Sequence, residues 1–289
     1  MKKTLLLLDQ AMVSGSAFLV TVLISNLFGS EAVGEYSLFL MAIQLPLMFQ
    51  MALVINPMMS SLINEEAFTY INQVLVLLIA FTSLLTMSVL EYREFGLISW
   101  TNIVYFFVPI YILKFEFDRR RLFYESKLWE AFFLDFCRCT ILIISLFVIQ
   151  ETNMYATYGY FCFIFILMLS CCLSLLLNGG GLKSLLIFQR SEYLPIKDIM
   201  TSLQHSYFLV TAGGIQWGLA SFPYLMVNFL FGTEKLGVIR EIQNLTGTLN
   251  VLYQSLENYF PKAIASELKR HGEKSALRYV IKLSVLAGV

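Results

Sequence analysis

The sequence predicts an all-α integral membrane protein: a polytopic helical bundle with one complete six-helix half and two to three helices of a second, parallel-repeat half. Composition is the first of three observations behind this fold class. Apolar and aromatic residues make up 58% of the 289 residues and charged residues only 14%, against about 45–50% and about 25% in a soluble domain. The apolar residues also fall into long blocks, and part of the sequence occurs twice.

The apolar blocks have the length of membrane-spanning helices, because a hydrocarbon core about 30 Å thick takes about 20 mostly apolar residues. A further run opens near Tyr279. We expect the first span to be retained and not cleaved as a signal peptide, since Asp9 interrupts the apolar run early and no small-residue cleavage site follows. The eight predicted spans are 8–28, 36–59, 71–90, 97–115, 131–149, 158–177, 207–230 and 238–260.

Lys and Arg are distributed as the positive-inside rule requires when the N-terminus is cytoplasmic. In this orientation 15 of the 20 basic residues lie in inner segments, and only Arg93 and Lys235 lie in outer loops. The sequence therefore predicts a multi-pass protein of the cell inner membrane. The formal net charge is zero, which gives no reason to expect a nucleic-acid partner.

The loops predict that the chain is not an enzyme. The outer loops are short, and the longest inner segment, 178–206, contains no Ser/His/Asp or metal-ligand grouping. All five cysteines lie in apolar blocks, where packing is the expected role. His205 and His271 lie in separate inner loops. We expect no catalytic residue, no metal site and no cofactor.

An eight-residue stretch occurs twice in the chain. Residues 27–34 (LFGSEAVG) recur as residues 230–237 (LFGTEKLG), with five identities at an offset of 203. At the same offset a face of small residues in the first span recurs in the seventh, and such faces let membrane helices approach closely. The small residues are Ala11 and Gly15 in the first copy and Gly214 and Gly218 in the second.

Six spans separate the two copies, so both cross the membrane in the same direction. Parallel repeats of this kind occur in transporters, whose substrate site lies between the two halves. The chain divides into a first six-helix bundle (1–177), a cytoplasmic linker (178–206) and an incomplete second bundle (207–289). A complete second copy would need about 400 residues in all, so we expect the chain to be truncated at its C-terminus.

Several motifs resemble those of a known transporter family. They are residues 9–16 (DQAMVSGS), Leu27-Phe28-Gly29 with Glu31 and Gly34, and Asn56-Pro57-Met58-Met59, and in the second copy 231–237, 243–244 and 256–261. Together they resemble the polysaccharide-transporter branch of the multidrug/oligosaccharidyl-lipid/polysaccharide exporter superfamily, which includes the O-antigen flippases. About four helices of that family's fold have no counterpart here.

The resemblance implies a flippase that moves a lipid-diphosphate-linked oligosaccharide across the inner membrane by alternating access. Such transport serves the synthesis of surface polysaccharide, for example the O-antigen of lipopolysaccharide or capsule. The implied partners are the lipid-linked oligosaccharide, membrane lipids and other membrane proteins of polysaccharide assembly.

Charged side chains inside the spans are the first candidates for a substrate cavity. A charge at mid-helix costs about 2.5–3.5 kcal/mol to insert, so it should be paired, lie near a helix end or have a function. Asp135 and Arg138 are three residues apart in the fifth span and share a face. Either they neutralise each other, or Arg138 contacts phosphate and Asp135 orients it. Arg240 either binds diphosphate through its planar fork of donors or lies at the membrane interface.

Uncharged and acidic neighbours complete the predicted cavity. Gln216 is a candidate sugar contact, Asn244 makes the eighth span wetter than its neighbours, and Glu257 is either a coupling carboxylate or a boundary residue. Gln10, together with Asp9, opens the first span, where an acidic residue favours the helix dipole.

A basic run precedes the fifth span. Arg119, Arg120 and Arg121 stand among aromatic residues, which is typical of a topology anchor at the membrane interface or of a surface that binds anionic lipid headgroups.

Three other functions stay open on the sequence. An ion-coupled exporter of the multidrug type would place carboxylates in the cavity instead of arginines, and the chain has both. An inactive, truncated remnant of such a transporter is a second alternative. A membrane glycan polymerase or ligase is less favoured, because the short outer loops leave little room for its active site.

Overall fold

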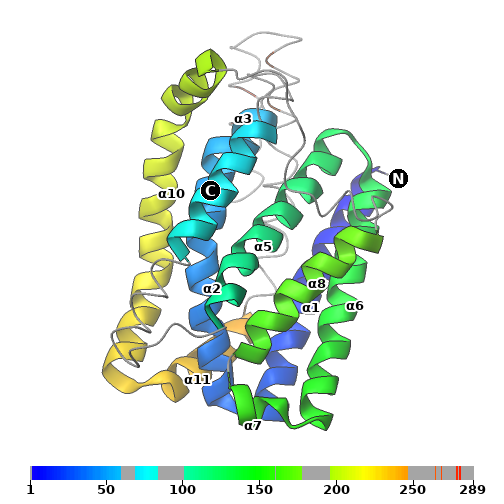
Figure 1. Cartoon of the computed structure of the whole chain (residues 1–289), viewed down its shortest axis with the longest axis vertical. Helices are drawn as coiled ribbons and strands as arrows, with labels where there is room; N and C mark the ends of the chain where they lie inside the picture. The colour runs from blue at the N-terminus through cyan, green and yellow to red at the C-terminus, as the bar shows by residue number, and fades with distance from the viewer. Residues whose placement is uncertain are drawn as a thin grey trace.

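The structure, a computed structural model, describes residues 2–59, 69–83, 101–159, 161–177 and 196–246, together with four single residues further along the chain. Within these residues all regular structure is helical and no strand occurs. The all-α part of the predicted fold class is therefore confirmed for the described chain (Figure 1).

The described helices follow one another along the chain. In chain order they are α1 (Lys2–Phe28), α2 (Ser30–Gln50), the π-helical turn η1 (Met51–Ile55), α3 (Asn56–Met59), a helix over Thr69–Ser83, α5 (Thr101–Tyr124), α6 (Leu128–Glu151), α7 (Met154–Tyr158), α8 (Phe161–Leu175), α10 (Ile196–Phe231) and α11 (Thr233–Thr246).

Three helical stretches are long and apolar enough to cross a membrane: Ala11–Phe28, Ser30–Met59 and Leu128–Glu151. They agree with the predicted spans 8–28, 36–59 and 131–149. Two shorter apolar helices match two further predicted spans: Thr69–Ser83 overlaps 71–90, and Cys162–Leu175 lies inside 158–177. The described part of the chain is thus compatible with an all-α membrane protein. Most of the predicted span 238–260 lies outside the described residues.

Several helix boundaries differ from the prediction. The helix α2 begins at Ser30 and not at residue 36, and α5 ends at Tyr124 and not at residue 115. The first helix begins at Lys2, ahead of the apolar run, because residues 2–7 continue the helix without a breaker. The helix α10 begins at Ile196, so the last part of the predicted linker 178–206 is helical. In each of these places a polar stretch continues an adjoining apolar helix, and hydropathy alone does not register this.

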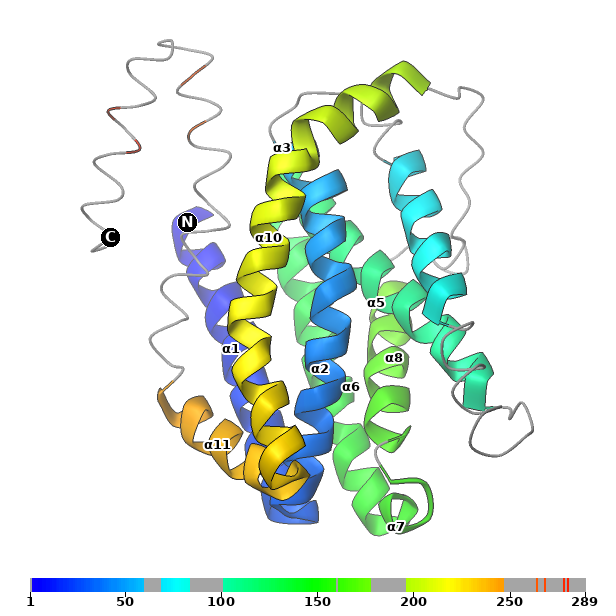
Figure 2. The ribbon, with the colours of Figure 1, turned by 90° about the vertical axis from the view of Figure 1, so that its left-hand side faces the viewer.

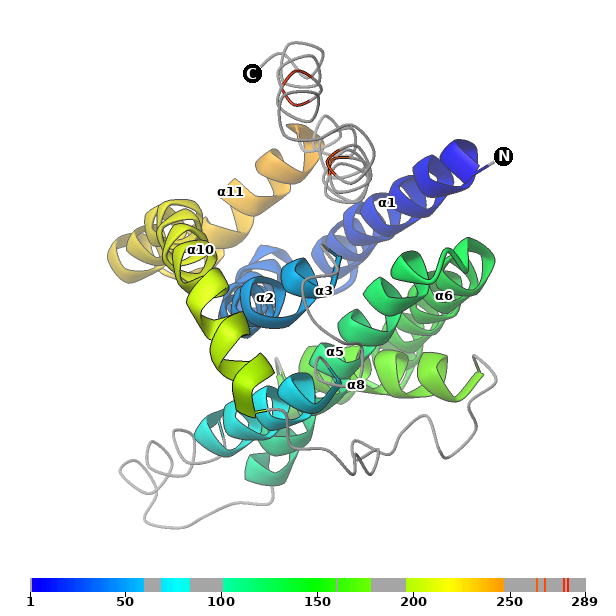
Figure 3. The same cartoon turned by 90° about the horizontal axis from the view of Figure 1, so that it is seen from above.

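The helices form two groups around α2. On one side α1 packs against α6, and α8 packs against both α5 and α6. Their shared core contains Val20, Ile24, Leu134, Leu146 and Phe163, all at most 1% exposed. On the other side α10 and α11 pack against α2. Seen from above, α1 and α10 lie on opposite sides of α2 (Figure 3).

Both copies of the repeated sequence form the same corner between two helices. Gly29 (φ 88°) and Gly232 (φ 84°) adopt left-handed backbone conformations, which glycine tolerates and other residues rarely do. The amide of Gly29 donates to the Ser25 carbonyl at 2.9 Å, and the amide of Gly232 donates to the Asn228 carbonyl at 3.0 Å. At each corner the helix that arrives, α1 or α10, runs in the same direction (Figure 2).

The helix that starts with α2 is irregular near its middle. It contains Pro46 and then widens into η1, a π-helical turn of the kind often found at functional positions. Just before this turn, the fully buried amide of Gln50 donates hydrogen bonds of 2.7 Å to the Asn72 side chain and to the Leu113 carbonyl. These bonds tie the wide turn to two neighbouring helices.

Candidate functional site

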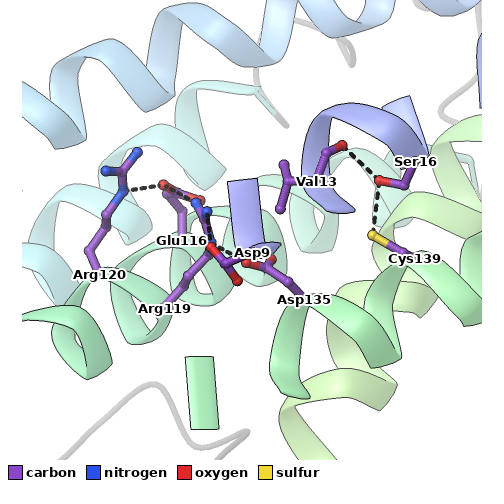
Figure 4. A network of polar contacts seen from close by, with 8 residues as sticks. All are labelled: Asp9, Val13, Ser16, Glu116, Arg119, Arg120, Asp135 and Cys139. Carbon is purple, nitrogen blue, oxygen red and sulfur yellow. Dashed lines mark hydrogen bonds and ion pairs between the residues drawn. The ribbon is translucent and has the colours of Figure 1, made fainter. Parts of the chain in front are cut away.

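The most concentrated charge in the described chain is a buried cluster between α1, α5 and α6 (Figure 4). Its centre is Arg119 of α5. The Nε of Arg119 donates to Asp135 of α6, and its Nη2 lies 3.4 Å from Oδ2 of Asp9 on α1. Only 6% of the Arg119 side chain, 3% of Asp9 and none of Asp135 is exposed.

A further carboxylate joins the cluster from α5 itself. Glu116 precedes Arg119 by three residues and Arg120 by four, the spacings that bring side chains together on one helix face. Glu116 lies 3.4 Å from Arg119 and accepts a 2.7 Å hydrogen bond from Arg120. The Arg119 guanidinium also lies 5.3 Å from the ring centroid of Phe123. Arg119 therefore contacts three carboxylates and one aromatic ring, contributed by three helices.

The cluster corrects two sequence predictions. Asp135 and Arg138 do not form the expected ion pair, because Asp135 binds Arg119 from the neighbouring helix instead. Asp9 does not cap the first helix, because α1 begins at Lys2 and places Asp9 in its interior. Both predictions placed the interaction within one helix, whereas the structure brings Asp9, Arg119 and Asp135 together from three helices.

Arg138 has no hydrogen bond or ion pair among the described residues. Its guanidinium lies 4.7 Å from the ring centroid of Phe115 on α5, a separation typical of cation–π contact. The side chain is half-buried. All of its N–H donors are therefore left for another group, as the alternative role, contact with phosphate, requires.

A second polar region lies on α11, where it meets α1 and α10. The Arg240 guanidinium lies 3.8 Å from the ring centroid of Tyr224 on α10 and donates a 2.8 Å hydrogen bond to Gln243. Its Nε is buried without a partner in the described chain. Asn244 donates to the Phe18 carbonyl of α1 at 3.2 Å. Arg240 and Asn244 thus belong to this region and not to the cluster around Arg119.

The remaining predicted residues are not brought to either region. Gln216 is exposed on α10. Its neighbour Trp217 points the other way and donates a 3.1 Å hydrogen bond to the Met41 carbonyl of α2. Glu257 lies outside the described residues, and the Gln10 side chain is likewise outside the description.

The two copies of the repeat contact each other. A Cβ atom at Gly34 would lie 2.1 Å from the Thr233 carbonyl oxygen, and one at Gly237 would lie 1.8 Å from the Ser30 carbonyl oxygen. Thr233 and Gly237 are the offset-203 equivalents of Ser30 and Gly34. The contact is therefore reciprocal, and α2 and α11 approach so closely that only glycine fits.

The predicted small faces of the first and seventh spans behave differently. A Cβ atom added at Gly15, Gly214 or Gly218 would meet nothing within 4 Å in the described structure. The expected close helix approach at these three glycines is therefore wrong. Close approach occurs instead at Gly34 and Gly237, and on α10 at Gly213, where a Cβ atom would lie 2.8 Å from the Met48 side chain. The sequence pattern identified small residues but could not say which ones touch.

The sequence interpretation missed the central role of Arg119. It assigned the run Arg119–Arg121 to the membrane interface as a group, although Arg119 is buried while Arg121 is one-third exposed. The signal was the acidic spacing: Glu116 stands three and four residues before two of the arginines, and buried acids were available on two other helices.

No protein-family model, no curated protein and no solved structure matches this chain. Within the described residues, no three His, Cys, Asp or Glu side chains are grouped so that they could hold a metal ion.

Proposed function

We propose that the chain is a membrane transporter of the flippase type, which moves a lipid-diphosphate-linked oligosaccharide across the inner membrane for surface polysaccharide synthesis. The observation that carries this proposal is the reciprocal contact of the two repeat copies, Gly34 with Thr233 and Gly237 with Ser30. A reciprocal contact is the mark of two units related by a two-fold axis. Transporters that work by alternating access are commonly built from two such halves.

The hydrogen bonds between the copies support the same relation. Trp217 of α10 donates to the backbone of α2, and Asn244 of α11 donates to the backbone of α1. Under the repeat α1 corresponds to α10 and α2 to α11, so these two bonds link equivalent pairs of helices. The parallel direction of α1 and α10 supports an axis along the membrane normal (Figure 2).

The two halves differ in how fully they are packed. Ser16 and Val20 of α1 are 8% and 1% exposed where α1 faces α6, whereas the equivalent Leu219 of α10 is 75% exposed and Pro223 is also exposed. Within the described residues α10 has no counterpart of α6. The proposal therefore assigns to this chain one packed half and the first hairpin of the other.

The available arginines suit an anionic headgroup. Among the described residues, Arg138 has no hydrogen-bond partner for its donors, and Arg240 has a buried Nε without a partner. Guanidinium groups bind phosphate oxygens through two parallel hydrogen bonds, which makes arginine a suitable ligand for a diphosphate. The proposed substrate contacts are Arg138 first and Arg240 second.

The test is lipid flipping in vesicles that contain the purified chain. A fluorescent lipid-diphosphate oligosaccharide is placed in both leaflets, and its exposure to an impermeant quencher is followed over time. The expected result is faster loss of the protected fraction than in protein-free vesicles. Arg138→Gln should slow it by about tenfold or more, since a hydrogen bond to a charged group contributes about 1.5–3 kcal/mol.

Arg121→Gln is the matched control, because Arg121 pairs with Glu125 near the end of α5. Its rate should equal that of the wild type. Equal rates for vesicles with and without protein would contradict transport by this chain, and equal rates for Arg138→Gln and wild type would remove Arg138 from the substrate path.

A second candidate function is an ion-coupled exporter of organic cations. It is favoured by the buried carboxylates Asp9 and Asp135, which lie between helices of the first half. Uptake of a fluorescent cation into inverted vesicles separates the two: an exporter takes up the dye and leaves the glycolipid in place, and a flippase does the opposite.

A further inference from the structure

Two arginines of the described chain lie over an aromatic ring of a neighbouring helix and form no ion pair within that part of the chain. The guanidinium of Arg138 on α6 lies 4.7 Å from the ring centroid of Phe115 on α5. That of Arg240 on α11 lies 3.8 Å from the ring centroid of Tyr224 on α10. Arg119 differs from both, because it forms ion pairs with carboxylates from three helices.

The acidic side chains near Arg138 are bound elsewhere. Asp135 and Glu116 both interact with Arg138 electrostatically, but each forms an ion pair with Arg119. In the described chain neither accepts a hydrogen bond from Arg138. The N–H donors of Arg138 are therefore available, although its side chain is half-buried.

An aromatic ring and a carboxylate hold a guanidinium in different ways. A carboxylate accepts one or two of its N–H hydrogen bonds. A ring attracts the cation through its electron-rich face and has no lone pair to accept those bonds in the plane of the guanidinium. An arginine that lies over a ring is thus held in place while its donors remain free to bind an oxyanion.

Phe115 is a rigid support for this contact. Its side chain is 1% exposed and belongs to the core of the first half. Phe115 and Arg119 are four residues apart on α5, and Asp135 and Arg138 are three apart on α6, so each pair shares a helix face. The ion pair between Arg119 and Asp135 therefore fixes α5 against α6 in the register that places the ring beside Arg138.

We infer that Phe115 is a positioning residue for anion binding, whose ring holds the Arg138 guanidinium so that its donors can bind two oxygens of one phosphate group. The ligand class is a phosphate or diphosphate oxyanion, either in a lipid headgroup or free. The benefit is preorganisation, since an arginine that is already held loses less freedom when the anion binds. This inference rests on the proposed function, which assigns Arg138 to the substrate path.

Binding to the purified full chain in detergent tests the role of Phe115. Fluorescence anisotropy of a labelled lipid diphosphate gives its Kd, and competition by inorganic pyrophosphate gives the Kd of the free anion. Phe115→Leu should raise both values by about fivefold or more, because leucine is apolar but has no ring. Phe115→Tyr keeps the ring and should bind within about twofold of the wild type.

Phe163→Leu is the matched control. Phe163 is also 1% exposed and lies in the same core, but its ring contacts other aromatic rings, among them Phe28 and Tyr155. Its Kd values should equal those of the wild type. If Phe115→Leu does not fold, Phe115→Met takes its place, because methionine adapts to irregular core space without a ring.

A double variant separates positioning of Arg138 from general packing. If the ring acts through Arg138, adding Phe115→Leu to Arg138→Gln should weaken binding by no more than about twofold beyond Arg138→Gln alone. If the ring acts only through packing, its whole effect should recur in the Arg138→Gln background. The pair of measurements thus reports on the coupling between the two side chains and not on stability.

Four results would overturn the inference: wild-type binding by Phe115→Leu, an equal loss in Phe163→Leu, full additivity in the double variant, or a loss for the lipid probe without one for pyrophosphate. The last would place the effect on the lipid tail. The flipping assay is judged separately. A chain that binds diphosphate through Arg138 and Phe115 but does not flip lipid would keep this inference and remove the proposed function.

Discussion

Gly237 of α11 lies against the backbone of α2 at Gly34: a Cβ atom at Gly237 would stand 3.1 Å from the Gly34 nitrogen and 1.8 Å from the Ser30 carbonyl oxygen. The same relation holds in reverse for Gly34 and Thr233. Two stretches of similar sequence, far apart in the chain, thus make one interface with each other. The helices can approach this closely because Gly34 and Gly237 carry a hydrogen atom where every other residue carries a Cβ atom.

Gly34→Ala should destabilise this interface. The added methyl group would overlap the Thr233 backbone, which cannot move as a side chain can, and such overpacking costs about 1–3 kcal/mol. Thermal unfolding in detergent measures the loss. Gly15→Ala is the matched control, because the added Cβ meets nothing within 4 Å in the described structure and alanine favours the helix by up to about 1 kcal/mol. Equal effects for the two variants would contradict the close α2–α11 contact.

Arg119→Met should be the most damaging single change in the first half. It removes the donor from Asp135, whose side chain is fully buried, and breaking a buried ion pair costs about 3–5 kcal/mol. Arg121→Met should cost no more than about 1 kcal/mol, because its pair with Glu125 is partly exposed. Denaturant titration of both variants gives the comparison. A mild Arg119→Met would mean that Asp135 finds another partner.

Gln50→Leu should loosen the widened turn of α2. The substitution removes the two 2.7 Å hydrogen bonds to Asn72 and to the Leu113 carbonyl, and leaving buried acceptors without a donor costs about 1–3 kcal/mol. Faster hydrogen exchange in η1 and the helix over Thr69–Ser83, read by mass spectrometry, is the expected sign. Gln150→Leu, at the exposed end of α6, should leave both segments unchanged.

Trp217→Phe tests the link between α10 and α2. Phenylalanine keeps an aromatic ring, smaller than the indole, but loses the 3.1 Å hydrogen bond to the Met41 carbonyl, a loss of about 1 kcal/mol. Trp129→Phe is the control, because Trp129 is 66% exposed and such surface changes stay within about 0.5 kcal/mol. Unfolding midpoints that fall equally in both variants would deny Trp217 this role.

Glu125 gives a small pH dependence outside the membrane spans. The hydrogen bond from Lys127 lowers the pKa of this carboxyl group in the folded chain. Its contribution to stability is therefore present above the unfolded pKa of about 4.3 and is lost as the pH falls through the lower folded value. Because the pair is partly exposed, the contribution is at most about 1 kcal/mol. The stability difference between wild type and Glu125→Gln, measured by denaturant titration at several pH values, should shrink on acidification.

The sequence predicted the helices well because long apolar runs have few alternatives. Ala11–Phe28 and Leu128–Glu151 both lie where hydropathy placed a span. The repeat also has a geometric counterpart that was not predicted: both of its first glycines adopt positive φ at a helix corner, and both of its last glycines lie in the interface. A conserved local shape can be read from a short motif, because glycine is required there for steric reasons.

Side-chain partners were harder to predict, because they depend on which helices meet. Asp135 has an arginine three residues later in its own helix, and along the sequence that is the obvious partner. In the structure Asp135 forms an ion pair with Arg119, and Arg138 lies over the Phe115 ring instead. Helix periodicity says which residues share a face, and only the packing of α5 on α6 decides what that face meets.

The distance along the chain between Gly34 and Gly237 bears on how the protein is made. At about 5–20 residues per second, a ribosome needs roughly 10 to 40 s to add α11 after α2 has been synthesised. During that interval the glycine surface of α2 has been synthesised and the matching surface of α11 has not. We expect that the uncovered surface can pair with the same surface of a second nascent chain. Insertion machinery that covers α2 until α11 is made would prevent this misassembly.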